Sequence, residues 1–173
     1  MKQKQRKIFY TSIFFLGLFS IIWEIEIYRN TIIDWYVPTL IILFSGILAF
    51  YIDIKNFKET YKYEGKELYL YSIMHYFVGF GFIICTVFML ANYYLSSSNT
   101  SAETFKILKR TELPNGKSLG KSTPAFTISY KGIDKELVFQ SEYLDSLNYY
   151  SEVQLKSKKG FLGFDIITQK KLK

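Results

Sequence analysis

IMHYFVGFGFIICTVFMLANYYL, from Ile73 to Leu95, decides the fold of this chain, because it contains no Asp, Glu, Lys or Arg. A hydrocarbon core about 30 Å thick requires about 20 helical residues, so this stretch is long enough to cross a membrane. Two further apolar stretches, Ile8 to Trp23 and Trp35 to Ile52, precede it. We therefore predict an integral membrane protein in which residues 1–95 form a domain of three transmembrane helices.

The first of these stretches is the shortest. It has about 16 residues before Glu24, so we expect Lys7 to snorkel at one end and Ile25 and Ile27 to extend the helix at the other. A cleaved secretory signal is the alternative. An uncleaved span is favoured because no small-x-small cleavage site follows the apolar run and no lipobox Cys is present.

The overall composition hides this concentration of apolar residues. The 173 residues carry a net charge of +7 and are 49% hydrophobic, averages that a basic globular domain would also show. Cys85 is the single Cys, which excludes an intramolecular disulfide and a Cys-based zinc site. The single His, His75, lies ten residues earlier, about 15 Å along a helix, too far for a nucleophile and its base. These counts exclude the commonest thiol, imidazole and zinc chemistries. We predict no catalytic, cofactor-binding or metal-binding residues and a protein that is not an enzyme, with a hydrolase that uses Ser, Asp or Lys groups of the β-domain as the alternative.

Basic residues in the short segments beside the spans predict the orientation. Bases are concentrated before the first span and between the second and third, whereas the connection from Glu24 to Asp34 contains one base, Arg29. The bases concerned are Lys2, Lys4, Arg6, Lys7, Lys55, Lys58, Lys62 and Lys66. Because such bases remain cytoplasmic, we predict a cytoplasmic N-terminus and an extracytoplasmic C-terminal domain, with the inverted topology as the alternative.

Lys58, Lys62 and Lys66 recur every four residues. On one helix they would form a single stripe that could interact with anionic headgroups. The alternative is that these lysines are topology signals on a solvated turn interrupted by Gly65. We treat the three lysines as possible interaction residues.

Polar and small residues within the spans bear on packing and transport. Ser45 and Ala49 form a small-xxx-small pair, which favours close packing within one three-helix bundle, with a homo-oligomer as the alternative. We find no ionisable residue in the middle of a span, where a transport path would require one. His75 and Asn92 lie near the ends of the third stretch, and we expect both to form interfacial hydrogen bonds.

The second half of the chain has the pattern of a small water-facing β-domain at residues 102–173, after a polar linker at residues 96–101. Short alternating segments separated by turn residues predict five strands. They are Glu103 to Arg110, Pro124 to Lys131, Lys135 to Gln140, Glu152 to Lys158 and Gly163 to Gln169. The fold class is therefore membrane α-helical plus all-β, the β part being a small five-stranded antiparallel barrel or sandwich.

Three connections complete this domain. Lys131 and Gly132 open a tight hairpin, and Ser141 to Tyr150 is interpreted as a short helical or irregular crossover. Phe161 and Leu162 lie at the turn that follows Lys158 and Lys159. These two apolar residues are possible interaction residues that either meet headgroups or a partner or pack under the sheet edge.

Two phosphate-binding interpretations fail. The segment Asn115 to Ser122 (NGKSLGKS) ends like a phosphate-binding loop, but Asn115 stands where the first Gly is required and Pro124 blocks the helix that should follow. We interpret it as a β-hairpin loop. The lysines of the β-domain are spread over strands and tail rather than gathered on an aromatic platform, so we predict no nucleic-acid partner.

The tail resembles a known kind of domain. The segments TPAFTISYKG (from Thr123) and VQLKSKKGFLGFDII (from Val153) are similar to the small C-terminal β-domains of uncharacterised bacterial multi-span membrane proteins. In those domains a Pro-led strand ending in Tyr precedes a tight turn, and a Gly-bearing strand follows. The resemblance covers the C-terminal third and implies an all-β domain on a membrane anchor in the inner (cytoplasmic) membrane of a bacterium.

Two classes of function follow from these features. The first is a non-enzymatic membrane protein that presents its β-domain to a protein or envelope component. The second is an oligomerising membrane effector, or an immunity or phage-defence component that acts on the bilayer. Growth arrest with depolarisation on overexpression would favour the second class, and a stable co-purifying partner the first.

Overall fold

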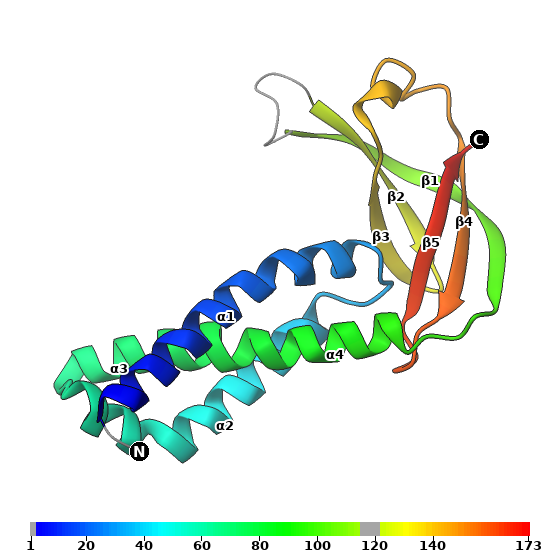
Figure 1. Ribbon diagram of the computed structural model, residues 1–173. Helices are drawn as coiled ribbons and strands as arrows, with labels where there is room; N and C mark the ends of the chain where they lie inside the picture. The colour runs from blue at the N-terminus through cyan, green and yellow to red at the C-terminus, as the bar shows by residue number, and fades with distance from the viewer. Residues whose placement is uncertain (1–2, 115–121) are drawn as a thin grey trace. The chain divides into compact units, whose positions relative to one another are not determined.

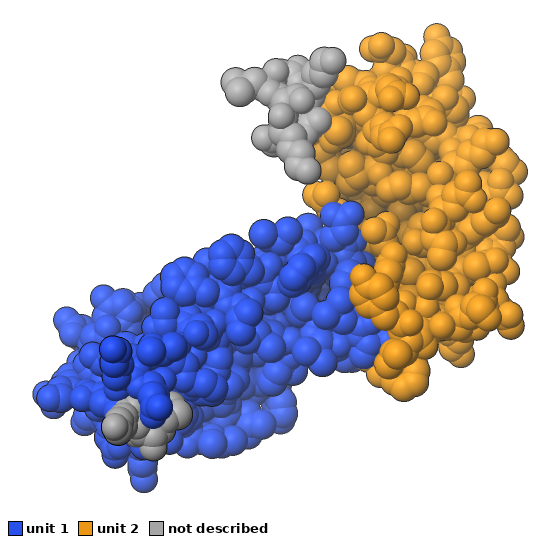
Figure 2. Space-filling model, in the orientation of Figure 1, with its two compact units in different colours: residues 1–28, 34–91 blue, residues 29–33, 92–173 orange. Residues whose placement is uncertain are grey.

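The computed structural model describes residues 3–114 and 122–173, which fold as two compact units (Figures 1 and 2). Unit 1 consists of Met1–Tyr28 and Asp34–Ala91 and is helical. Unit 2 consists of Arg29–Ile33 and Asn92–Lys173 and contains the sheet. The phosphate-loop-like residues 115–121 lie outside the described residues.

Three long helical runs form nearly all of unit 1 (Figure 1). They are α1 (Gln3–Arg29), α2 (Tyr36–Tyr61) and a continuous run of α3 (Gly65–Met74), the π-helical segment η1 (His75–Gly81) and α4 (Phe82–Tyr94). Each run is long and apolar enough to cross a membrane, which confirms the three predicted apolar helices. All three extend beyond their apolar stretches at one end or both, because helical hydrogen bonding continues into polar residues.

Unit 1 is apolar outside and closely packed inside. Phe44 and Ile52 are more than 70% exposed, as expected for side chains that face lipid. Ser45 of the predicted small-residue pair is buried. At Gly17 a Cβ atom would lie 2.0 Å from the carbonyl oxygen of Val78, so a glycine is required where α1 crosses η1.

Unit 2 contains a five-stranded antiparallel sheet of order β3-β2-β1-β4-β5 (Figure 1). The strands are β1 (Thr100–Pro114), β2 (Ser122–Tyr130), β3 (Ile133–Val138), β4 (Glu152–Lys159) and β5 (Asp165–Leu172). Five antiparallel strands confirm the prediction. The barrel alternative is wrong, because β3 and β5 are the edges of an unclosed sheet. β1 begins at Thr100, within the segment expected to be a linker.

The long strand β1 is shared by two halves of the sheet. Its first half pairs with β4 and its second half with β2, and the register shifts between Ile107 and Lys109. Side chains from both halves form one core, so the sheet buries its inner face against itself. The fully buried members include Phe126, Ile128 and Val153.

The predicted β2–β3 hairpin is confirmed. Lys131 and Gly132 form its two-residue loop with φ of 50° and 87°, both positive as a type I′ turn requires. Ser141–Tyr143 (η2) is a single 3-10 turn within the connection that follows β3, in agreement with the predicted short helical or irregular crossover.

A segment from between α1 and α2 belongs to the sheet domain. Thr31 forms a β-bridge with Ile166, the Ile32 N–H donates to the Asp165 carbonyl oxygen at 2.7 Å, and Ile33 is 2% exposed. Lys135 of β3 donates its Nζ proton to the Thr31 carbonyl oxygen at 2.7 Å. Residues 29–33 therefore lie along the edge of β5 and contact β3. They must lie on the same side of a membrane as the sheet.

Candidate functional site

The candidate site is a polar notch on the outward face of strands β4 and β5. In β4, Val153 and Leu155 are buried, so the alternating residues Gln154 and Lys156 point away from the core. The register places Gln154 opposite Lys171 and Lys156 opposite Gln169. These four side chains line a hollow of about 230 Å³.

The chemistry of this notch suits an anionic group. Its lining side chains are two ammonium groups, each with three donors, and two amides with both donors and acceptors. A carboxylate or phosphate group in the hollow could accept hydrogen bonds from both strands. Local sequence patterns do not predict the notch, because they do not specify the register of β4 against β5, which shifts between Lys156 and Ser157.

Phe161 and Leu162 lie in the turn between β4 and β5. Phe161 is 62% exposed and Leu162 is 38% exposed. The turn is closed by a hydrogen bond from the Gly160 N–H to the Phe164 carbonyl oxygen, and Gly163 has a φ of 94°. Of the two arrangements considered from sequence, the structure therefore has both side chains exposed rather than under the sheet edge.

Lys58, Lys62 and Lys66 do not lie on one helix. Lys58 is in the last turn of α2, whereas Lys62 follows the helix with a φ of 60° and Lys66 is in α3, which begins at Gly65. The helical-stripe interpretation is therefore wrong, and the interpretation as a turn interrupted by Gly65 is correct. The physical reason is that the left-handed residue Lys62 ends α2 by donating its N–H to the Lys58 carbonyl oxygen at 2.7 Å.

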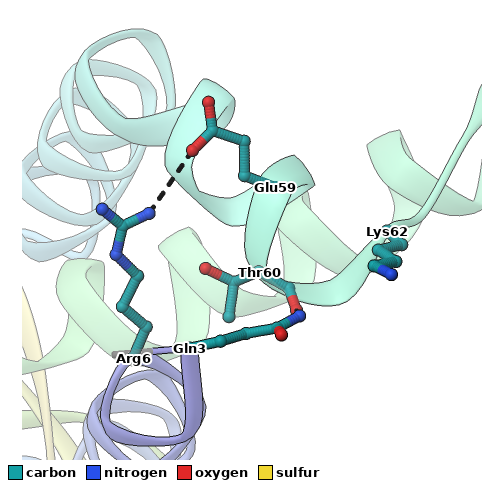
Figure 3. A pocket seen from close by; sticks show the side chains of 5 residues that line it. All are labelled: Gln3, Arg6, Glu59, Thr60 and Lys62. Carbon is teal, nitrogen blue, oxygen red and sulfur yellow. Dashed lines mark hydrogen bonds and ion pairs between the residues drawn. The ribbon is translucent and has the colours of Figure 1, made fainter. Parts of the chain in front are cut away.

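Lys62 also lines a second hollow, of about 350 Å³, between α1 and α2 (Figure 3). The Arg6 guanidinium lies 3.4 Å from the Glu59 carboxylate, and Gln3 Nε2 donates to the Thr60 carbonyl oxygen at 3.2 Å. The ion pair is partly exposed and so contributes little to stability. We assign no ligand to this hollow.

A half-buried carboxylate, that of Asp53, organises the neighbouring part of unit 1. Asp53 Oδ2 accepts hydrogen bonds from the hydroxyls of Tyr10 at 2.7 Å and Tyr76 at 3.1 Å. Its other oxygen accepts from Asn56 Nδ2 at 2.7 Å. These bonds connect α1, α2 and η1 through one acceptor group, which lowers the cost of keeping a carboxylate among apolar side chains.

His75 lies beside this cluster. Its imidazole is surrounded by the rings of Tyr10, Phe57 and Tyr76, with centroid distances of 5.2, 5.2 and 5.1 Å. His75 Nε2 is buried and has no hydrogen-bond partner among the described residues, so the expected interfacial hydrogen bonding is wrong for this atom. The residue also begins the π-helical segment η1, a kind of distortion that is frequent at functional sites.

A second carboxylate, that of Glu24, is buried near the end of the first span rather than in its middle. The helix α1 continues to Arg29, and Glu24 is 8% exposed. Its carboxylate oxygens lie 3.1 Å from Cys85 Sγ and 3.3 Å from Thr86 Oγ1, the donors that make its burial possible. Ile25 and Ile27, which follow Glu24, were the sequence signal that the helix continues.

Neither a metal site among the described residues nor a known relative indicates the chemistry of this protein. Residues 3–114 and 122–173 contain no group of three or more His, Cys, Asp or Glu side chains placed to hold a metal ion. No protein-family model, curated protein or solved structure matches the chain.

Proposed function

We propose that this protein is a non-enzymatic integral membrane protein that presents its small β-domain outside the cytoplasm to bind a protein or an envelope component. The observation that carries this proposal is the pairing of Thr31 with Ile166. It puts the connection between α1 and α2 on the side of the sheet, as three membrane crossings require. The N-terminus and the turn around Lys62 then belong to the opposite side.

The distribution of bases supports the orientation. Lys4, Arg6 and Lys7 begin α1, and Lys58 and Lys62 end α2, all on the side opposite the sheet in this topology. Since such bases are retained in the cytoplasm, the sheet faces away from it. The inner membrane of a bacterium, implied by the resemblance of the tail, is the location we propose.

The notch formed by Gln154, Lys156, Gln169 and Lys171 is the binding surface we propose for this domain. Its position on the outward face leaves the core of the domain intact when a ligand binds, which suits a stable binding module. The partner would present carboxylate or phosphate groups to the two lysines.

Cysteine labelling in intact cells tests the orientation. Single cysteines replace Ser98 or Tyr149 on the sheet side, and Glu64 serves as the matched control in the turn between α2 and α3, all three residues being exposed. Cys85→Ser removes the native thiol. We expect a membrane-impermeant maleimide to label positions 98 and 149 in outer-permeabilised cells, and position 64 only after lysis. The reverse pattern would refute the extracytoplasmic β-domain.

Charge reversal tests the binding surface. The double variant Lys156→Glu, Lys171→Glu should lose co-purifying partners that the wild-type protein retains in detergent. Lys109→Glu, an exposed change on β1 away from the notch, is the matched control. Equal recovery of partners by all three proteins would show that the notch is not the binding surface.

A second candidate is the membrane effector or immunity component. The observation that favours it is the ionisable groups within the helices, of which Glu24 and His75 are buried and Asp53 is half-buried. Such groups at membrane depth mark functional sites by default. Overexpression with a potential-sensitive dye tests it. Depolarisation by the wild-type protein that Asp53→Asn abolishes would favour this candidate, and an unchanged membrane potential would exclude it.

A further inference from the structure

The turn between β4 and β5 is held by the last turn of α4. Asn92 is 1% exposed, its Nδ2 donates to the Phe164 carbonyl oxygen at 3.0 Å, and its Oδ1 accepts from the Leu162 N–H at 3.0 Å. The Phe161 N–H donates to the Asn92 carbonyl oxygen at 3.2 Å. A Cβ at Gly160 would lie 2.4 Å from Asn92 Oδ1, so the turn approaches this side chain as closely as a glycine permits.

This attachment fixes the depth of the turn in a membrane. Asn92 lies within the third candidate span, Gly65–Tyr94, two residues before its end. The apolar stretch of this helix ends at Leu95, so this end of the helix belongs at the boundary between acyl chains and headgroups. Residues bonded to Asn92 must therefore lie at that boundary too, whichever side of the membrane the sheet faces.

The exposed side chains at this place are those that an interface prefers. Phe161 is 62% exposed, and Tyr94 and Leu95 at the end of α4 are 72% and 62% exposed. Aromatic and aliphatic side chains at this depth remove apolar area from water when they enter the acyl boundary. A water-facing turn would gain nothing from them.

Basic residues flank the apolar ones. Lys158 and Lys159 end β4 immediately before the turn, and the Lys158 ammonium lies 5.7 Å from the centroid of the Tyr93 ring. Lysine side chains beside an apolar group that enters the acyl boundary place their ammonium groups among lipid phosphates, to which they are attracted in an anionic membrane.

We propose that Phe161 and Leu162 insert into the headgroup and acyl boundary of the bilayer, with Lys158 and Lys159 at the phosphates of anionic lipids. The partner of this surface is the lipid bilayer that holds the helices. This insertion rests on the membrane residence in the proposed function and does not depend on the ligand of the notch.

Spin labels in the full-length protein test the insertion. Phe161→Cys and Leu162→Cys are prepared in the Cys85→Ser background and reconstituted into nanodiscs of phosphatidylcholine and phosphatidylglycerol. Tyr149→Cys is the matched control, because Tyr149 is an 85% exposed aromatic residue that precedes β4 by three residues, whereas the turn follows the other end of this strand, which is roughly 25 Å long. Two positions in the turn are labelled so that the measurement can still be made if one of the two variants fails to fold.

We expect labels at 161 and 162 to collide more with oxygen than with a water-soluble nickel complex, and the label at 149 to show the opposite order. If the labels at 161 and 162 collide more with the nickel complex than with oxygen, as the label at 149 should, the proposed insertion is wrong. Labels immobilised and shielded from both reagents would also overturn it, because they would indicate a protein contact.

Lipid charge tests the part played by the lysines. Lys158→Gln with Lys159→Gln should reduce the insertion depth of the label at 161 in discs that contain phosphatidylglycerol, and should have a smaller effect in phosphatidylcholine alone. An equal effect in both lipids, or no effect in either, would refute the contact with anionic headgroups. The insertion of Phe161 and Leu162 is tested separately by the oxygen and nickel measurement.

Discussion

The buried lysine of β3 predicts an unusual dependence of stability on pH. Lys135 is 6% exposed and donates to the Thr31 carbonyl oxygen, so its ammonium group is held in the sheet domain away from water. Burial, and secondarily the charge of Lys170, lowers the pKa of Lys135 to about 8 from its ordinary value of 10.5. Lys170 is itself shifted downward, by burial and then by the charge of Arg29, so the pKa values of both lysines fall.

The direction in which stability changes with pH follows from proton binding by Lys135 in the folded and unfolded states. Below about pH 8 the lysine is charged in both the folded and the unfolded chain, so the cost of burying the charge is fully present. Between about pH 8 and 10.5 the unfolded chain binds a proton that the folded chain lacks, so stability rises with pH. At about 1.4 kcal/mol per pH unit, stability at pH 9.5 should exceed that at pH 7.5 by about 2 kcal/mol.

Pulse proteolysis of the full chain in detergent micelles measures this change. Urea unfolds the sheet domain at each pH between 7.5 and 9.5, and a brief protease pulse reports the unfolded fraction. The midpoint should rise with pH, and Lys135→Met should flatten most of the rise, with Lys170→Met removing the remainder. A wild-type midpoint that is constant or falls over this range, or an identical slope in Lys135→Met, would refute the buried ammonium.

Three further predictions test other contacts. Asn92→Ala removes two side-chain hydrogen bonds to the β4–β5 turn and should destabilise unit 2 by about 1–3 kcal/mol in the same proteolysis assay, and an unchanged midpoint would contradict the attachment. Gly17→Ala places a methyl group against the Val78 carbonyl and should lower the aggregation temperature of the detergent-solubilised protein by several degrees, whereas Leu18→Ala, at a 43% exposed position, should not. A fragment of residues 96–173 should elute as aggregates in gel filtration, and one that carries residues 28–34 fused ahead of residue 92 should elute as a monomer. Monomeric behaviour of the shorter fragment would show that the added edge segment is dispensable.

Residue patterns predicted the elements of this fold better than the contacts between them. Three apolar stretches and alternating segments such as Phe126 to Tyr130 indicated the helices and strands, since periodicity follows directly from local geometry. The burial of Glu24 could not be predicted in this way, because its partners Cys85 and Thr86 are about 60 residues away in the sequence. The notch likewise depends on the register of β4 against β5, which local patterns do not specify.

The sheet-containing unit also includes residues outside the β-domain and linker expected from the sequence, because contacts distant in the sequence stabilise it. A sheet of five short strands is near the lower limit of independent stability. Without a partner, the edge strand β5 would also be able to pair with other chains. Residues 29–33 meet both needs, because Thr31 pairs with the edge while Ile32 and Ile33 bury apolar area. Asn92 makes a similar contribution at the β4–β5 turn. The β-domain therefore includes residues that the sequence assigns to the membrane part, and we expect its stability to depend on residues 29–33 and Asn92 as well as on the five strands.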